Sequence, residues 1–62
     1  MTKYIIQVGK INQHYQDKAT VYDNEYVARM IYNGVNLIPG HKKRLLDYRD
    51  RRSFVLERSI LR

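Results

Sequence analysis

Hydrophobic and polar residues alternate at the start of the chain. In residues 3–11 (KYIIQVGKI), the side chains of Tyr4, Ile6 and Val8 fall on one side of an extended chain. This period of two, with its β-branched and aromatic residues, predicts a strand. A polar, turn-forming stretch follows, and residues 19–22 (ATVY) predict a second, short strand that pairs back on the first as a hairpin.

The spacing of apolar residues changes to that of a helix in the next segment. They recur at positions i, i+3 and i+4, and they are Val27, Met30 and Ile31. Asp23 stands where an N-cap belongs, and Gly34 suits the position after the last helical residue. These signals predict a helix over about residues 24–33, with Met30 and Ile31 facing the core.

The basic segment that follows Pro39-Gly40 is the next candidate element. Lys43 and Asp47 are spaced at i, i+4, and so are Asp47 and Arg51. Oppositely charged side chains at this spacing are neighbours on a helix surface. The spacing therefore favours a helix over about residues 42–51 with its charged face exposed.

The end of the chain allows two secondary structures. Phe54, Leu56 and Ile60 alternate with other residues, which predicts a strand over residues 53–61. The alternative is one long helix over residues 42–61, because most apolar residues of this segment also share one side of a helix. Phe54 would then lie outside that side, which favours the strand.

Together these elements predict an α+β domain. Its small antiparallel sheet consists of the hairpin plus the C-terminal strand, and it packs on one central helix, with the basic segment exposed. The 62 residues, 1–62, suffice for a single domain with a small core. The chain has no cysteine, and its two histidines are too far apart for a zinc motif, so we expect no disulfide and no metal. A small core without such links also predicts self-association as a homo-oligomer.

The positive charge is concentrated in the second half of the chain. Residues 42–62 hold eight Lys or Arg against three Asp or Glu, a net of +5, whereas residues 1–41 hold four against three, a net of +1. Such an asymmetry indicates an acidic partner. Backbone phosphates of DNA or RNA are the first candidate.

The candidate contact residues lie between positions 42 and 52. They are Lys42, Lys43, Arg44, Tyr48, Arg49, Arg51 and Arg52. The cations are expected to contact phosphates, and Tyr48, inside the basic stretch, to stack on an exposed base. The alternative partner is an acidic surface of a host protein such as a polymerase or nuclease. If the basic segment has no binding function, it is a solvated helix face, whose exposed ion pairs stabilise the fold only weakly.

Other functional classes find little support in the sequence. It contains no GxSxG, P-loop or HExxH motif, so we expect no enzymatic activity and no cofactor. No apolar run approaches the 18 or so residues of a membrane span, and polar residues interrupt the N-terminal segment too early for a signal peptide. These features predict a cytoplasmic protein without a membrane partner.

In length and in its Tyr-, Asn- and Lys-rich composition, the chain resembles the small accessory proteins that tailed bacteriophages make early in infection. The resemblance rests on no motif, so no site residue is carried over from it. It implies a protein that binds nucleic acid or a host factor and alters its activity.

Overall fold

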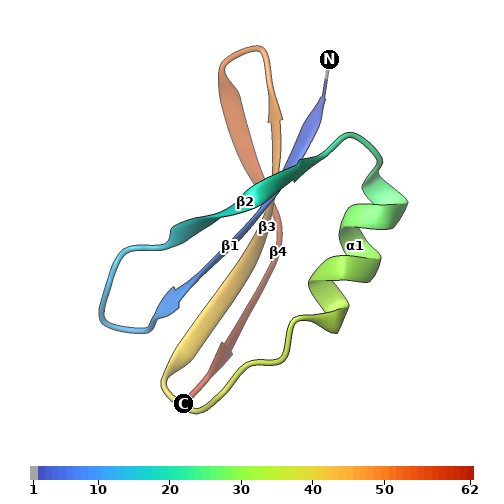
Figure 1. Cartoon of the computed structure of the whole chain (residues 1–62). Coiled ribbons are helices and arrows are strands. Elements are labelled where there is room, and N and C mark those ends of the chain that lie inside the picture. The colour runs from blue at the N-terminus through green and yellow to red at the C-terminus, as the bar shows by residue number, and fades with distance from the viewer. Residues whose placement is uncertain (1) are drawn as a thin grey trace.

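The computed structural model describes residues 2–62, without the side chains of residues 17–19. Within this part, the elements are β1 (Lys3–Lys10), β2 (Gln16–Tyr22), α1 (Glu25–Gly34), β3 (His41–Arg49) and β4 (Arg52–Leu61). The strands form an antiparallel sheet in the order β2-β1-β3-β4, and α1 lies against one of its faces (Figure 1). The α+β class, the first hairpin and the central helix are therefore confirmed.

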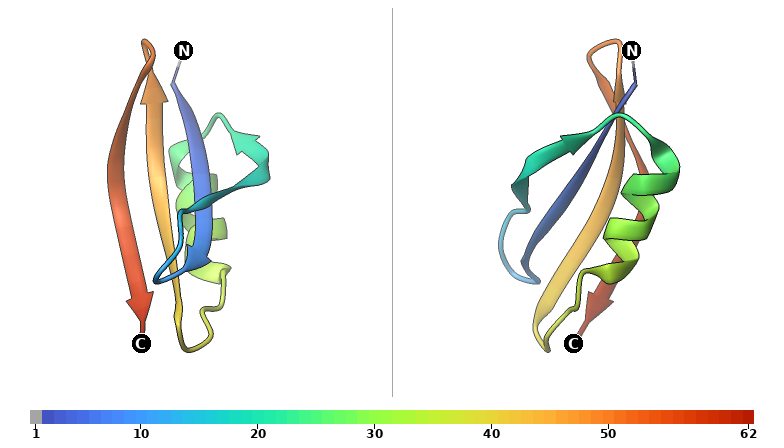
Figure 2. Two further views of the ribbon diagram at one scale, coloured as in Figure 1. Left: turned by 90° about the vertical axis from the view of Figure 1, so that its left-hand side faces the viewer. Right: turned by 45° about the vertical axis from the view of Figure 1, so that its right-hand side comes forward.

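The register between β1 and β3 decides which side chains face the helix. Ile6 stands directly opposite Leu45, and residues opposite one another on neighbouring strands point to the same side of a sheet. Both pack with Ala28 and Tyr32 of α1 in a buried cluster. In the left panel of Figure 2, α1 lies behind the sheet, and the viewer sees the other side, which we call the open face.

The basic segment is a strand, so the predicted helix over residues 42–51 is wrong. β3 lies between β1 and β4, and it buries Leu45 and Leu46, which are 0% and 6% exposed, toward opposite faces of the sheet. Burying a leucine side chain stabilises by about 1.5–3 kcal/mol, whereas an i, i+4 ion pair on a helix contributes only about 0.2–0.5 kcal/mol. Packing therefore outweighs the charge spacing.

The alternative of one helix over residues 42–61 is wrong for the same reason, and the predicted C-terminal strand is confirmed as β4. A two-residue turn, Asp50-Arg51, joins β3 to β4, and both residues have positive φ values, 49° and 62°. Such a turn matches the twist of the two strands. The usual Asn-Gly or Asp-Gly signature is absent, so no local pattern predicts this hairpin.

The helix lies where its pattern predicted, but its cap and its buried face differ. Asn24 is the N-cap, because its Oδ1 accepts a hydrogen bond of 3.1 Å from the backbone N–H of Val27; the prediction of Asp23 is wrong by one residue. The prediction that Met30 and Ile31 face the core is also wrong, since they are 58% and 39% exposed. Ala28 and Tyr32 face the sheet instead.

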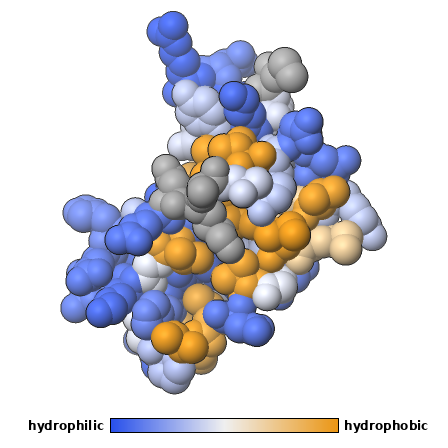
Figure 3. Space-filling model, viewed as in Figure 1, coloured by the Kyte–Doolittle hydropathy of each residue, from blue (hydrophilic) through white to orange (hydrophobic). Residues whose placement is uncertain are grey.

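The exposed side of α1 is rich in apolar side chains. Tyr26, Val27, Met30 and Ile31 all lie on it, and Figure 3 shows hydrophobic side chains gathered over the helix. This is the surface most suited to the self-association that the small core predicts. Homo-oligomer formation stays a prediction.

Candidate functional site

Strand geometry divides the basic segment between the two faces of the sheet. Successive side chains of a strand point to opposite sides, and Leu45 points toward α1. Lys43 therefore shares the helix side, while Lys42 and Arg44 point to the open face. Their cross-strand partners on β4 follow the same division, because Lys42 stands opposite Ile60 and Arg44 opposite Arg58.

Lys43 is buried at the C-terminal end of the helix. Only 8% of the residue is exposed, and its Nζ donates hydrogen bonds to the backbone carbonyls of Tyr32, at 2.7 Å, and Val35, at 2.8 Å. The ammonium also lies 4.3 Å from the centre of the Tyr32 ring. Helix C-termini carry unpaired carbonyls and partial negative charge. Lys43 satisfies them, so its charge is used inside the protein.

Tyr32 completes this buried polar arrangement. Its hydroxyl lies 2.8 Å from the hydroxyl of Ser59 on β4. Burial raises the pKa of the Tyr32 phenol above its usual value, and the hydrogen bond to Ser59 opposes that rise. The phenol therefore stays neutral at ordinary pH, and the Lys43 ammonium faces an uncharged ring.

Lys42 and Arg44 are held together on the open face by an aromatic ring. The Lys42 Nζ lies 4.4 Å, and the Arg44 Cζ 4.0 Å, from the centre of the Tyr15 ring. Cations at these distances are attracted by the ring electrons. The Arg44 Nε also donates a hydrogen bond of 2.6 Å to Oε1 of Gln7, and the Lys42 Nζ one of 3.3 Å to the carbonyl of Ile11.

Gly9 allows Tyr15 to reach this position. A Cβ atom at residue 9 would lie 2.9 Å from the carbonyl oxygen of His14 and 3.4 Å from the Cα of Tyr15. Only glycine lets the loop between β1 and β2 approach the strand so closely. The glycine in β1 is thus explained by the position of the ring that holds two cations.

Arg58 adds a third cation to this surface. It is exposed and stands directly opposite Arg44, where like charges repel and destabilise a sheet. We call Lys42, Arg44 and Arg58 the open-face cluster. By register, Asp17 of β2 stands opposite Gln7; its side chain is outside the described part.

A second group of cations lies at the turn between β3 and β4. Arg49, Arg51 and Arg52 are exposed there, and the Arg49 Cζ lies 5.7 Å from the centre of the Phe54 ring. We call these three arginines the hairpin tip, which projects at the top of Figure 1. Figure 3 shows hydrophilic side chains in the same place.

Tyr48 lies on the open face between the two groups of cations. Its residue is 40% exposed, and it stands opposite Lys3 on β1 and Ser53 on β4. Arg49 follows Arg44 by five positions along β3, which corresponds to about 16 Å at about 3.3 Å per residue. The structure thus brings Lys42 and Arg44 together, places the hairpin-tip arginines together about 16 Å away, and leaves Tyr48 between them.

Sequence reasoning missed Arg58, Tyr15 and Gln7 as neighbours of the basic residues. Arg58 would have been found from the strand assignment, because it pairs with Arg44 once both segments are strands. Tyr15 lies in a polar loop, and no local pattern indicates that its ring returns to β3.

Comparisons with known proteins do not identify the chain. No family model, no curated protein sequence and no solved structure matches it. In the described part of the chain, the helix is too short and too polar to cross a membrane. The functional argument therefore rests on the geometry of the open face.

Proposed function

We propose that the protein is a non-enzymatic nucleic-acid-binding protein that contacts backbone phosphates through its open face. The observation that carries the proposal is the pairing of Arg44 with Arg58, directly opposite each other on a face that α1 leaves uncovered. Like charges at directly opposed positions destabilise a sheet, although the Arg44 guanidinium is also held toward β1 by Gln7 and the Tyr15 ring. A phosphate bound between them would remove that repulsion and gain charge-assisted hydrogen bonds.

The arrangement of the remaining cations fits a strand that follows the open face of β3 and reaches the hairpin tip at the end of the sheet, where Arg49 and Arg52 point to the helix side. The open-face cluster and the hairpin tip are about 16 Å apart along the strand, which corresponds to about five steps of a stacked nucleic-acid strand at about 3.4 Å per nucleotide. Tyr48 lies between them with an exposed ring, where an unpaired base could stack. Lys43 is left out of this group of contact residues, because two carbonyls occupy its ammonium.

Fluorescence anisotropy with labelled DNA and RNA oligonucleotides, titrated at several salt concentrations, tests the proposal. Each phosphate that the protein no longer neutralises should flatten the slope of log K against log[salt] by about 0.9 on duplex DNA or about 0.7 on a single strand. Replacing both Arg44 and Arg58 by Gln should therefore flatten the slope by about 1.4–1.8 and weaken binding to every sequence.

Arg62→Gln is the matched control, because it removes one positive charge at the end of the chain, away from the opposed pair. It should change the slope much less than Arg58→Gln alone. If the double variant bound nucleic acid as tightly as the parent, with the same slope, the open face would not be the phosphate-binding surface.

An inhibitor or modulator of a host protein such as a polymerase or nuclease is the second candidate function. It is favoured by the apolar side chains exposed on α1, which a nucleic-acid partner would not require. A tagged pull-down from host lysate with and without nuclease separates the two. Recovery of one acidic host protein after nuclease treatment, together with no binding to purified oligonucleotides, would favour this candidate.

A further inference from the structure

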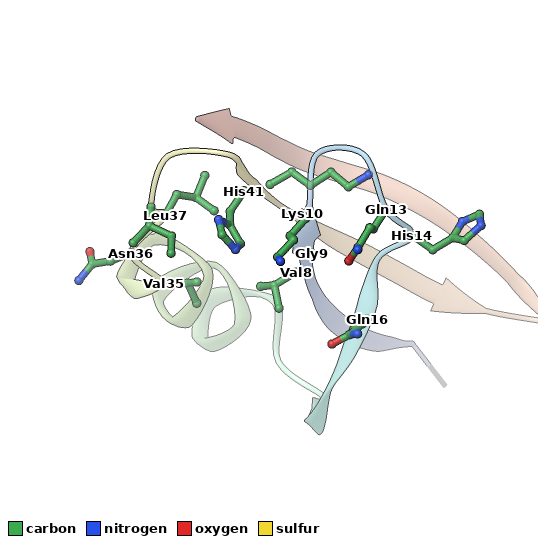
Figure 4. Close-up of a pocket in the computed structure, with 12 residues that line it drawn as sticks. Val8, Gly9, Lys10, Gln13, His14, Gln16, Val35, Asn36, Leu37 and His41 are labelled. Atoms are coloured by element: carbon green, nitrogen blue, oxygen red, sulfur yellow. The ribbon is translucent and has the colours of Figure 1, made fainter. Parts of the chain in front are cut away.

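A pocket of about 460 Å³ lies on the helix side of the sheet, beyond the C-terminal end of α1. The end of β1, the loop between β1 and β2, and the segment between α1 and β3 enclose it (Figure 4). Val8, Val35 and Leu37 supply an aliphatic lining, while Lys10, Gln13 and His41 supply polar groups. In Figure 4, His14 and Asn36 point away from the hollow.

Backbone hydrogen bonds join the walls of this pocket. The N–H of Ile11 donates to the carbonyl of Gly40 at 3.0 Å, which ties the end of β1 to the start of β3. The N–H of Gly40 donates in turn to the carbonyl of Leu61 at 2.7 Å. Gly9 lets the loop between β1 and β2 close against the strand. The hollow is therefore enclosed by three segments that the fold holds together.

The orientation of His41 leaves one ring nitrogen for a ligand. Its Nδ1 lies 3.2 Å from the carbonyl oxygen of Pro39, and because a carbonyl only accepts, Nδ1 carries the proton. Nε2 is then the acceptor in the neutral ring and a second donor in the protonated ring. Lys10 stands directly opposite His41 across β1 and β3, so its ammonium and the imidazole share one rim.

The charge of the lining fits an anion with an apolar body. None of the described residues that line the pocket is acidic, and two of them, Lys10 and Lys42, are cations. Its volume falls in the usual range for small-molecule sites, about 300–1,000 Å³. Lys42 also belongs to the open-face cluster, with its Nζ over the Tyr15 ring. The pocket and the proposed nucleic-acid surface therefore share one residue.

We propose that this pocket binds a single unpaired nucleotide. The base lies against Val8, Val35 and Leu37, and the phosphate accepts hydrogen bonds from the Lys10 ammonium and from the Nε2–H of the protonated His41 ring. The nucleotide comes either from solution or from the phosphorylated end of a strand bound on the open face, and the second source rests on the proposed function. In that case the strand passes Lys42 on its way from the open face into the pocket.

Two probes distinguish the sources. Adenosine 5′-monophosphate, with adenosine as the control that lacks phosphate, is titrated against the full chain by calorimetry and by amide chemical shifts. A single-stranded ten-nucleotide oligothymidine is compared with and without a 5′-phosphate. Removing a charge-assisted hydrogen bond should weaken binding about tenfold. Lys10→Gln and His41→Gln should therefore each weaken the monophosphate about tenfold, and Arg58→Gln, outside the pocket, should not.

Leu37→Ser tests the lining independently of the charges, since Leu37 lies in the segment between α1 and β3 rather than in a strand or helix. It should weaken both adenosine and the monophosphate. For a strand end, the 5′-phosphate should tighten oligonucleotide binding, and Lys10→Gln should abolish that difference while sparing the unphosphorylated strand. Melting temperatures of the variants show that each is folded.

The outcomes separate this proposal from the proposed function. Shifts in the pocket residues with the monophosphate, but no oligonucleotide binding, would keep the pocket and overturn the open-face function. Oligonucleotide binding that depends on Arg44 and Arg58, with no effect of the 5′-phosphate or of the pocket variants and with no binding of the monophosphate, would keep the open face and overturn the pocket. No shift in the pocket with either probe also overturns it.

Discussion

Lys43 and Arg44 are neighbours in the chain, yet they lie in opposite environments. The Lys43 ammonium is buried between two carbonyls at the end of α1. The Arg44 guanidinium lies on the open face, against the Tyr15 ring and opposite a second arginine. The first cation is enclosed by the fold, whereas the second stands on an uncovered face opposite another cation, where like charges repel. Charge along a sequence therefore does not define a binding surface until the strand has divided it between two faces.

The largest effects should come from the helix side of β3. Leu45 is 0% exposed and packs against α1, so Leu45→Ala should lower the free energy of unfolding by about 2–5 kcal/mol. Met30→Ala, on the exposed side of α1, should cost less than about 1 kcal/mol. Urea denaturation measures both. Equal losses would mean that α1 packs on the sheet through another face.

Lys43→Met compared with Arg44→Met tests the contrast between the two cations. Methionine keeps much of the side-chain volume but cannot donate, so at position 43 it removes the ammonium donor from the carbonyls of Tyr32 and Val35, and the Tyr32 carbonyl keeps only the N–H of Val35. We expect a loss of about 2–3 kcal/mol. Arg44→Met should change stability by less than about 1 kcal/mol and should weaken nucleic-acid binding instead. A mild Lys43→Met variant that no longer bound nucleic acid would reverse the assignment of the two residues.

The helix cap should give a smaller effect. Asn24 accepts the N–H of Val27, so Asn24→Ala should destabilise by about 1 kcal/mol. Asp23→Ala, one residue earlier and exposed, is the control and should change stability by less than about 0.5 kcal/mol. Thermal melts in the same buffer are sufficient, and a larger loss from Asp23 would restore it as the cap.

The elements predicted correctly are those whose sequence carries one clear period. β1 alternates because one of its sides faces the core, and α1 shows helical spacing next to a capping residue. The central strand β3 shows no such period, because it buries Leu45 and Leu46 on opposite faces and so breaks the alternation. The charges at i, i+4 then favoured a helix. The segment forms a strand because of burial in the tertiary structure, which local spacing does not reveal.

The candidate site was predictable in region but not in arrangement. The net charge of residues 42–62 indicated where the cations lie, and Lys42 and Arg44 are indeed together. Because the segment of β3 was predicted as a helix, neither the interior position of Lys43 nor the pairing of Arg44 with Arg58 could be expected. Tyr15 could not be found from sequence, because its position against β3 depends on a loop that closes over Gly9.

The smallest change in stability should also be the most informative, because the same substitution is expected to stabilise the fold and to weaken nucleic-acid binding. Arg58→Gln removes the repulsion with Arg44, so it should raise the free energy of unfolding by about 0.2–1 kcal/mol. The same change should weaken nucleic-acid binding if a phosphate lies between the two guanidinium groups. Arg62→Gln, the matched loss of charge, should do neither, and added salt should shrink the stability gain because it screens exposed charges. A variant that was both less stable and unchanged in binding would show that Arg58 packs as a structural residue, and the open face would lose its main support.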